Sequence, residues 1–163
     1  MAVLATLAVG RPPVVLRRAV AADLPELVAL LAADQLGATR DGIRTDGDLE
    51  AYQAAFDAID ADPAHLLVVA QAGEDIVGTL QLSFLPGLAR RGGLRAQIEA
   101  VRVSASSRRR GLGAAMMTWA ITESRRRGCG LVQLTTDKAR PDAHRFYERL
   151  GFTASHEGMK LRL

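Results

Sequence analysis

The segment 108–114, which reads Arg-Arg-Arg-Gly-Leu-Gly-Ala, constrains the fold of this chain more than any other stretch. It lies between a run typical of a β-strand, residues 97–104, and a strong helical pattern over residues 112–127. Glycine lets the backbone approach a ligand closely, and the helix that follows directs free N–H groups and a positive dipole end toward it. The segment therefore predicts a pyrophosphate-binding turn, and the simpler alternative is a solvated basic turn.

Two other phosphate-binding motifs do not match this segment. It lacks the Gly-Lys-Ser/Thr of a P-loop, and it lacks the third glycine of a dinucleotide fingerprint. The formal net charge of +3 suits an anionic ligand, either the phosphates of a cofactor or a nucleic-acid backbone. Charge alone does not choose between them.

Hydrophobic periodicity predicts an alternation of strands and helices around this turn. Helical spacing is expected over 24–31, 48–61, 112–127 and 141–150, and strands over 14–19, 66–70, 76–85, 97–104, 131–135, 152–156 and 159–163. Residues 35–47 and 86–93 are expected to be loops. In the strand 97–104 the two faces do not separate cleanly, which indicates burial on both faces or a bulge. The order predicts an α/β (α+β) domain with one mixed sheet.

Length and composition fit one such domain. The chain has 163 residues, of which 48% are hydrophobic and 24% charged, as in ordinary globular proteins. We expect residues 1–13 to be a loosely held N-terminal extension and residues 14–163 to be the domain. Cys129 is the only cysteine, so no intramolecular disulfide and no Cys-based zinc site are expected. No stretch reads as a membrane span, and a cytoplasmic location is expected.

The turn and a second motif together resemble the GCN5-related N-acetyltransferase (GNAT) superfamily. Its central signature is Arg/Gln-x-x-Gly-x-Gly/Ala after the fourth strand, and Arg108, Gly111 and Gly113 occupy its defined positions. The stretch 143–152, Ala-His-Arg-Phe-Tyr-Glu-Arg-Leu-Gly-Phe, resembles the family's closing helix. The resemblance covers about residues 14–163. It implies a mostly antiparallel mixed sheet with a splay between the family's strands 4 and 5, flanked by about four helices.

The resemblance also implies acetyl-CoA as cosubstrate, an amine as acceptor and no metal. Val101 and Val103 would pair through their backbones with the pantetheine arm. The expected pyrophosphate contacts are Arg108, Arg109, Arg110, Gly111, Leu112, Gly113 and Ala114. The family often has Asn near the end of its fifth strand, where this chain has Asp137, with Arg140 nearby, as the candidate contacts.

Two further residues match catalytic positions of the family. Tyr147 matches the tyrosine that reprotonates the leaving thiolate, and Glu99 matches a carboxylate that receives the proton of the amine, directly or through water. A backbone N–H near Val101 is the expected oxyanion donor. Each has a simpler alternative: Glu99 as a solvent-facing strand residue and Tyr147 as a packing aromatic. His144 is interpreted as an ordinary surface or packing residue, and Cys129 as a small turn residue that need not react.

Three functions stay open on these residues. The leading hypothesis is acetyl transfer to a primary amine of a small molecule or a protein. A non-catalytic acyl-CoA-binding sensor is the alternative. A nucleic-acid-binding protein, suggested by the triplets 108–110 and 125–127, is the third hypothesis, and strong salt-dependent binding to DNA would distinguish it. The resemblance implies an acceptor site lined largely by the first two helices and nearby loops, here residues 35–47 and 86–93. Polyamines, aminoglycosides, amino acids and protein amines all remain open as acceptors. A homodimer would be common for the family.

Overall fold

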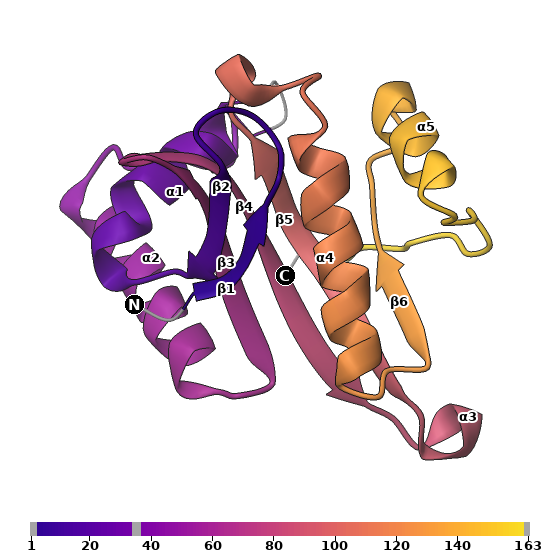
Figure 1. Cartoon of the computed structure of the whole chain (residues 1–163). Coiled ribbons are helices and arrows are strands. Elements are labelled where there is room, and N and C mark those ends of the chain that lie inside the picture. Colours follow the sequence, from indigo (N-terminus) through magenta and orange to yellow (C-terminus); the bar gives the residue numbers. More distant parts are fainter. Residues whose placement is uncertain (1–2, 34–36, 162–163) are drawn as a thin grey trace.

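The computed structural model describes residues 3–33 and 37–161. They form one sheet whose strands lie side by side in chain order, with helices on both faces (Figure 1). The strands are β1 (Val3–Leu7), β2 (Val14–Arg18), β3 (His65–Ala72), β4 (Asp75–Pro86), β5 (Leu94–Val103) and β6 (Leu131–Leu134). The helices are α1 (Leu24–Ala32), α2 (Asp46–Ala61), α3 (Ala89–Gly92), α4 (Leu112–Arg126) and α5 (Pro141–Arg149), with 3-10 turns at Ala21–Asp23 and Ala105–Ser107.

The sheet is mixed and mostly antiparallel, as predicted. Each neighbouring pair from β1 to β5 is antiparallel, and only β5 and β6 run parallel. The last pair of the parallel ladder joins Ile98 to Leu134, whereas β5 continues to Val103. The two strands therefore part beyond Ile98, which is the predicted splay.

A β-bulge lies directly beyond the point where β5 and β6 part. The ladder between β4 and β5 passes from Gln81↔Glu99 to Thr79↔Arg102, so β5 carries one residue more than β4 over this interval. Ala100 has a φ of 53°, which is unusual for a residue with a Cβ. The predicted irregularity of this strand is a bulge, and such bulges re-aim the residues that follow.

Two apolar clusters hold the layers together. On one face, buried β-strand side chains such as Leu80 and Ile98 pack with Leu112, Met116 and Met117 of α4. On the other face, Leu24 and Leu27 of α1 pack with Phe56 of α2 and with Val69 of β3, among others. The sheet is thus covered on both sides, and its β5–β6 end carries the glycine turn and α5.

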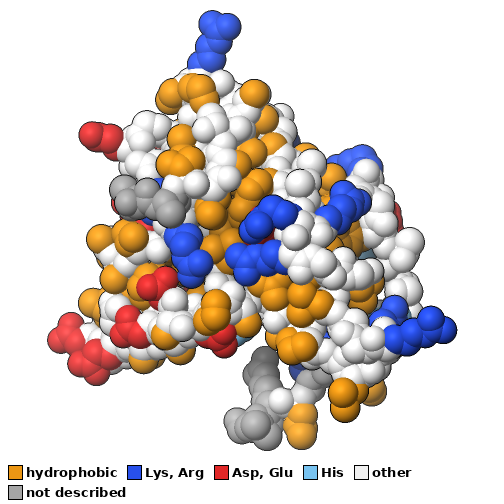
Figure 2. Space-filling model, turned by 60° about the horizontal axis from the view of Figure 1, so that its bottom comes forward, with side chains coloured by type: hydrophobic (Ala, Val, Ile, Leu, Met, Phe, Trp, Pro, Cys, Tyr) orange, Lys and Arg blue, Asp and Glu red, His pale blue; other side chains and the backbone are white. Residues whose placement is uncertain are grey.

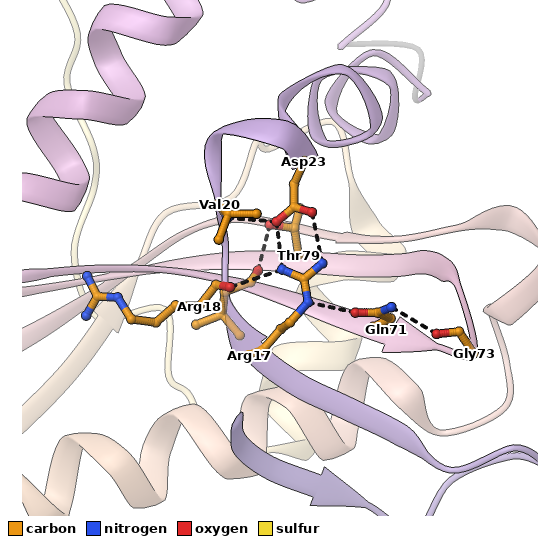
Figure 3. A network of polar contacts seen from close by, with 8 residues as sticks. Arg17, Arg18, Val20, Asp23, Gln71, Gly73 and Thr79 are labelled. Atoms are coloured by element: carbon orange, nitrogen blue, oxygen red, sulfur yellow. Dashed lines mark hydrogen bonds and ion pairs between the residues drawn. The ribbon is translucent and has the colours of Figure 1, made fainter. Parts of the chain in front are cut away.

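A buried ion pair fixes the start of the first helical layer (Figure 3). Arg17 on β2 donates to both carboxylate oxygens of Asp23, at 2.7 and 2.8 Å, and to Gln71 on β3 at 2.7 Å. The Asp23 carboxylate also accepts the Val20 N–H at 2.8 Å. Asp23 is the N-cap residue of α1, but its side chain makes no capping hydrogen bond to α1 and instead ties the turn before α1 to the sheet.

Three expectations about local structure are corrected. Residues 3–7 are not a loose extension, because β1 pairs with β2 at the sheet edge from Val3↔Arg17 to Leu7↔Val14. The expected loop 86–93 contains α3, a single turn whose Arg90 and Arg91 have left-handed φ values of 58° and 60°.

The expected strands 152–156 and 159–163 are wrong over the described residues 152–161, which are irregular. Met159 and Leu161 alternate as strand residues do, yet they are 97% and 87% exposed. Alternation alone does not make a strand, because a strand also needs a partner edge with which to exchange hydrogen bonds. Residues 162 and 163 lie outside the described part of the chain.

Candidate functional site

The candidate site lies where β5 and β6 part. Three features meet there: the bulge of β5, the glycine turn that leads into α4, and α5, which follows β6. Phe146 and Tyr147 of α5 and Val101 and Val103 of β5 all pack against the core cluster on the α4 side of the sheet. Residues more than 40 positions apart in sequence therefore share one apolar cluster.

The glycine turn presents the N-terminus of α4. Gly111 is the N-cap with a φ of 81°, and Arg109 before it has a φ of 61°. The first intrahelical bond runs from the Ala115 N–H to the Gly111 carbonyl at 3.0 Å. The N–H groups of Leu112, Gly113 and Ala114 lie before it, in the first turn, where a helix offers no internal acceptor. This is the geometry of an anion-binding helix end.

Gly113 lies where the two sequence motifs meet. A Cβ added to Gly113 would lie 3.5 Å from the Phe146 ring and 3.6 Å from the Val103 side chain, which are ordinary van der Waals distances. The first turn of α4 is therefore next to both α5 and the end of β5.

Arg108 is tied back to the sheet. Its Nε donates to the Val103 carbonyl at 3.1 Å, so this side chain braces the turn against the end of β5. In this conformation the Val103 carbonyl, expected to pair with a pantetheine arm, already accepts a hydrogen bond. Arg109 and Arg110 are exposed beside the turn.

Tyr147 lies in an aromatic cluster on the inner side of α5. Its ring meets Phe146 and Phe152 edge-to-face, with centroids 5.1 and 5.9 Å apart. Burial raises the pKa of the Tyr147 phenol above its ordinary value of 10.0, although the positive charges of Arg140 and Arg102 act in the opposite direction. The phenol is therefore protonated at neutral pH, as a proton donor must be.

Glu99 lies on the other face of β5. It is opposite Gln81 in the ladder, and residues directly opposite in a ladder share a face of the sheet. Gln81, Thr79 and Ala100 line a cavity of about 180 Å³ that is covered by α1 and α2. Glu99 itself is exposed and does not line this cavity, although its ladder partner Gln81 and its neighbour Ala100 do.

The loop between β6 and α5 is built by its own hydrogen bonds. The Asp137 carboxylate accepts the Ala139 N–H at 2.9 Å, and the Asp137 carbonyl accepts the Arg140 N–H at 3.0 Å. His144 places its Nε2 3.0 Å from the same carbonyl. Asp137 and His144 thus shape the loop, and no described contact carries Asp137 into the splay.

Sequence reasoning missed two groups at this site. The Thr136 hydroxyl, two residues after the end of β6, is buried and has no hydrogen-bond partner among the described residues. Arg102 had no assigned role, because its position after a bulge cannot be read from alternation.

Cys129 is half-buried, and burial raises the pKa of its thiol above the ordinary 9.0, although the charge of Arg127 acts in the opposite direction. The raised pKa disfavours a thiolate nucleophile.

Three features together define the class of acetyltransferase folds. They are the parallel strands β5 and β6 that part, the bulge in β5, and the glycine turn at the N-terminus of α4. A family model confirms it: the chain belongs to the Acetyltransferase (GNAT) family, whose model matches residues 30–152. It is an N-acetyltransferase, as the sequence motifs predicted.

Several known proteins are similar to this chain. The aminoalkylphosphonate N-acetyltransferase of Salmonella typhimurium is 31% identical over 115 residues, covering 70% of this chain and 73% of that protein. A transcriptional regulator from Bacillus halodurans is 47% identical, with a TM-score of 0.87, over 92% of this chain and 99% of that one. A putative acetyltransferase from Agrobacterium tumefaciens is 31% identical, with a TM-score of 0.78, over 91% and 99%.

None of the described helices is long and apolar enough to cross a membrane. No group of three or more His, Cys, Asp or Glu side chains within residues 3–33 and 37–161 is arranged to hold a metal ion.

Proposed function

We propose that the enzyme transfers the acetyl group of acetyl-CoA directly to a primary amine of a small molecule. The observation that carries the proposal is the first turn of α4, whose N–H groups have no acceptor within the helix and whose Gly113 lies next to Phe146 of α5 and Val103 of β5. The buried hydroxyl of Thr136, beyond the end of β6, supports it, because a bound pantetheine amide would satisfy that group. The Salmonella relative acts on an aminoalkylphosphonate, which favours a small acceptor.

Acetyl-CoA, when bound, supplies the acetyl group as an activated thioester. The residues of the chain accept and donate protons around the thioester and stabilise the charge that forms on it. An alkylamine has a pKa of about 10.4 and is protonated at pH 7, so Glu99 receives its proton, directly or through water. A backbone N–H at the bulge near Val101 stabilises negative charge on the carbonyl oxygen. Tyr147 holds the proton that the departing sulfur needs, and Cys129 takes no part.

The cofactor site is tested by replacing both glycines of the turn. In a Gly111→Asp, Gly113→Asp variant, we expect acetyl-CoA binding to weaken at least about tenfold, because added carboxylates repel phosphate and obstruct the turn. The φ of 81° at Gly111 also disfavours any side chain. Calorimetric titration measures the loss. The control is Gly130→Asp, where a Cβ meets nothing within 4 Å. If both variants bind acetyl-CoA as tightly as the native protein, the pyrophosphate does not bind at this turn.

The proton acceptor is tested by Glu99→Gln. We expect kcat/KM for the amine to fall about 10²-fold at pH 7, because no carboxylate takes the ammonium proton. The loss should shrink as the pH rises toward the amine's own pKa, where the solvent supplies the neutral amine. Glu74→Gln, in the exposed turn between β3 and β4, is the matched control. A pH-independent loss would assign Glu99 a structural role instead.

A second function, regulation of transcription, is favoured only by the name of the Bacillus halodurans structure. The arginine triplets give it little support. Arg126 and Arg127 at the end of α4 both pair with Glu123, at 2.7 and 2.8 Å, and Arg108 braces the turn. A regulator of transcription would bind duplex DNA in a salt-dependent way, and bovine albumin, as the control, would not.

A further inference from the structure

The cavity of about 180 Å³ between the sheet and the helices α1 and α2 has mainly apolar walls. Its lining includes Leu27 and Leu31 of α1, Phe56 and Ile59 of α2, and Leu67 of β3. None of the described residues that line it is charged. An apolar group that enters the cavity therefore leaves water and gains dispersion contacts with its walls.

Two of the three polar residues in the lining already hold hydrogen-bond partners. The Thr79 hydroxyl donates to a backbone carbonyl of β3 at 2.9 Å. The Tyr52 hydroxyl accepts the Gly42 N–H at 3.2 Å and donates to the Asp41 carboxylate at 3.4 Å. The Gln81 amide is the third polar group. Since a buried hydroxyl or charge without a partner costs free energy, this lining selects an apolar group.

The volume of the cavity suits a group of about the size of a benzene ring. In another protein, an engineered apolar cavity of about 150 Å³ binds benzene. The cavity in this chain measures about 180 Å³. Pockets for drug-sized ligands are larger, at roughly 300–1,000 Å³. A phenyl ring or a branched alkyl group therefore fits, and a larger scaffold does not.

The cavity reaches the bulge of β5, where the proposed chemistry takes place. Ala100, whose φ is 53°, lines the cavity, and so does Gln81, the ladder partner of Glu99. Glu99 directly precedes Ala100, and Val101 directly follows it. The proposed proton acceptor and the proposed oxyanion donor are thus the two sequence neighbours of a residue in the cavity wall.

The helix α2, which covers the cavity, carries acidic side chains and no Lys or Arg. The acids are Asp46, Asp48, Glu50, Asp57 and Asp60. Figure 2 shows Asp and Glu side chains gathered on one flank of the molecule, the side on which α2 lies in Figure 1. A surface of one sign raises the local concentration of ligands of the opposite sign. This flank therefore favours a ligand that carries a positive charge besides its apolar group.

Resting on the proposed function, we infer that this cavity binds an apolar group of the acceptor, about the size of a benzene ring, while the amino group of the same molecule lies outside the cavity at the bulge. The acceptor is then a small arylalkyl or branched alkyl amine. A polyamine or an aminoglycoside would place charges or hydroxyl groups against walls that lack partners for them. A phosphonate would meet the same apolar walls, beside an acidic helix.

The first test compares acceptors that share an aminoethyl group. With saturating acetyl-CoA, we expect kcat/KM for 2-phenylethylamine to exceed that for ethylamine at least about tenfold, because even one methylene in an apolar pocket contributes about tenfold or more. The gain should lie mainly in KM, since the ring is remote from the reacting atoms. 2-Aminoethylphosphonate should be no better than ethylamine. If ethylamine or 2-aminoethylphosphonate equals or exceeds 2-phenylethylamine, the inference is overturned.

Variants that fill the cavity test its location. Ala55 lines the cavity from α2, whereas Ala58, three residues later, is exposed and does not line it. Ala55→Leu should lower the ratio of kcat/KM for 2-phenylethylamine to that for ethylamine at least about tenfold. Leu31→Trp should act in the same direction from α1, and Ala58→Leu is the matched control. Thermal melting checks that each variant is folded. An unchanged ratio in both folded cavity variants would contradict the inference.

A binding measurement distinguishes failure of this inference from failure of the proposed function. The native protein is titrated with 2-phenylethylamine in a calorimeter, in the presence of non-reactive CoA, with and without toluene as a competitor that lacks the amine. Binding that toluene weakens, and that is at least about tenfold weaker in Ala55→Leu, supports the inference even if no amine is acetylated. No binding, or binding that toluene leaves unchanged, overturns the inference, whether or not ethylamine is acetylated.

Discussion

Tyr147→Phe is expected to lower kcat about 10²-fold while acetyl-CoA binds as tightly as before. Phenylalanine keeps the ring contacts with Phe146 and Phe152 and removes only the hydroxyl. A general acid typically contributes 10²- to 10⁴-fold, and we take the lower end because water can also protonate a thiolate. Steady-state kinetics give kcat, and calorimetry gives the Kd of acetyl-CoA.

The pH dependence adds an independent readout. Because burial raises the pKa of Tyr147 above 10.0, the native enzyme should keep its proton donor through neutral pH and lose it only above pH 10. The alkaline fall in kcat should be absent from Tyr147→Phe. Phe152→Leu, which removes a ring contact but keeps the phenol, is the control and should cost far less. An unchanged kcat in Tyr147→Phe would leave Tyr147 as a packing residue.

Asp23→Asn is expected to destabilise the fold by about 3 kcal/mol, because it leaves the Arg17 guanidinium buried without its counter-charge. Arg17 and Asp23 are 5% and 7% exposed, so water cannot replace the lost partner. For a chain of this length, the loss corresponds to a melting temperature lower by about 10 °C. Urea titration and calorimetry measure both quantities.

The ion pair between Arg17 and Asp23 decides how the stability of the fold depends on pH. Burial alone would raise the pKa of Asp23, but the hydrogen bonds from Arg17 and the Val20 N–H outweigh it, so the pKa lies below 3.8. The stabilisation is therefore present above the unfolded-state pKa and is lost as the pH falls through the lower, folded-state pKa. Asp23→Asn should lack this acid-dependent loss.

Two further variants serve as controls for the predicted loss of stability in Asp23→Asn. Glu157→Gln breaks the ion pair between Lys138 and Glu157, whose side chains are 81% and 82% exposed, and should not change stability measurably. Replacing both members, Arg17→Met with Asp23→Leu, should recover part of the loss, because no buried charge remains. Equal stability of Asp23→Asn and the native protein would show that the network in Figure 3 contributes nothing.

The sequence predicted the elements that glycine, proline and apolar spacing define. The helices expected over 112–127 and 141–150 correspond to α4 and α5, and the strands expected over 66–70 and 76–85 correspond to β3 and β4. The irregularity of β5 was also predicted, because Ile98, Glu99 and Val101 do not alternate cleanly. These features depend on residues close in sequence, and local chemistry suffices for them.

Other features depend on distant partners and were not predictable. The edge strand β1 needs β2 beside it, and the alternating Met159 and Leu161 do not form a strand without a partner among the described residues. The side chain of Arg17 finds Asp23 only once β2 and the turn before α1 are folded. At the site, the sequence motif over 143–152 pointed to Tyr147. The position of Arg102 could not be predicted, because it follows a bulge that only the strand register shows.

The central claim, direct acetyl transfer from acetyl-CoA to an amine, is tested most directly by a product balance. The purified enzyme is mixed with acetyl-CoA and an amine panel that includes 2-aminoethylphosphonate, β-alanine and n-propylamine. Released thiol, N-acetylated amine and the intact mass of the protein are measured in the same samples. We expect thiol and N-acetylamine in equal amounts, with no mass gained by the protein. Thiol release without N-acetylamine, or an acetylated protein that forms first and decays with turnover, would contradict it.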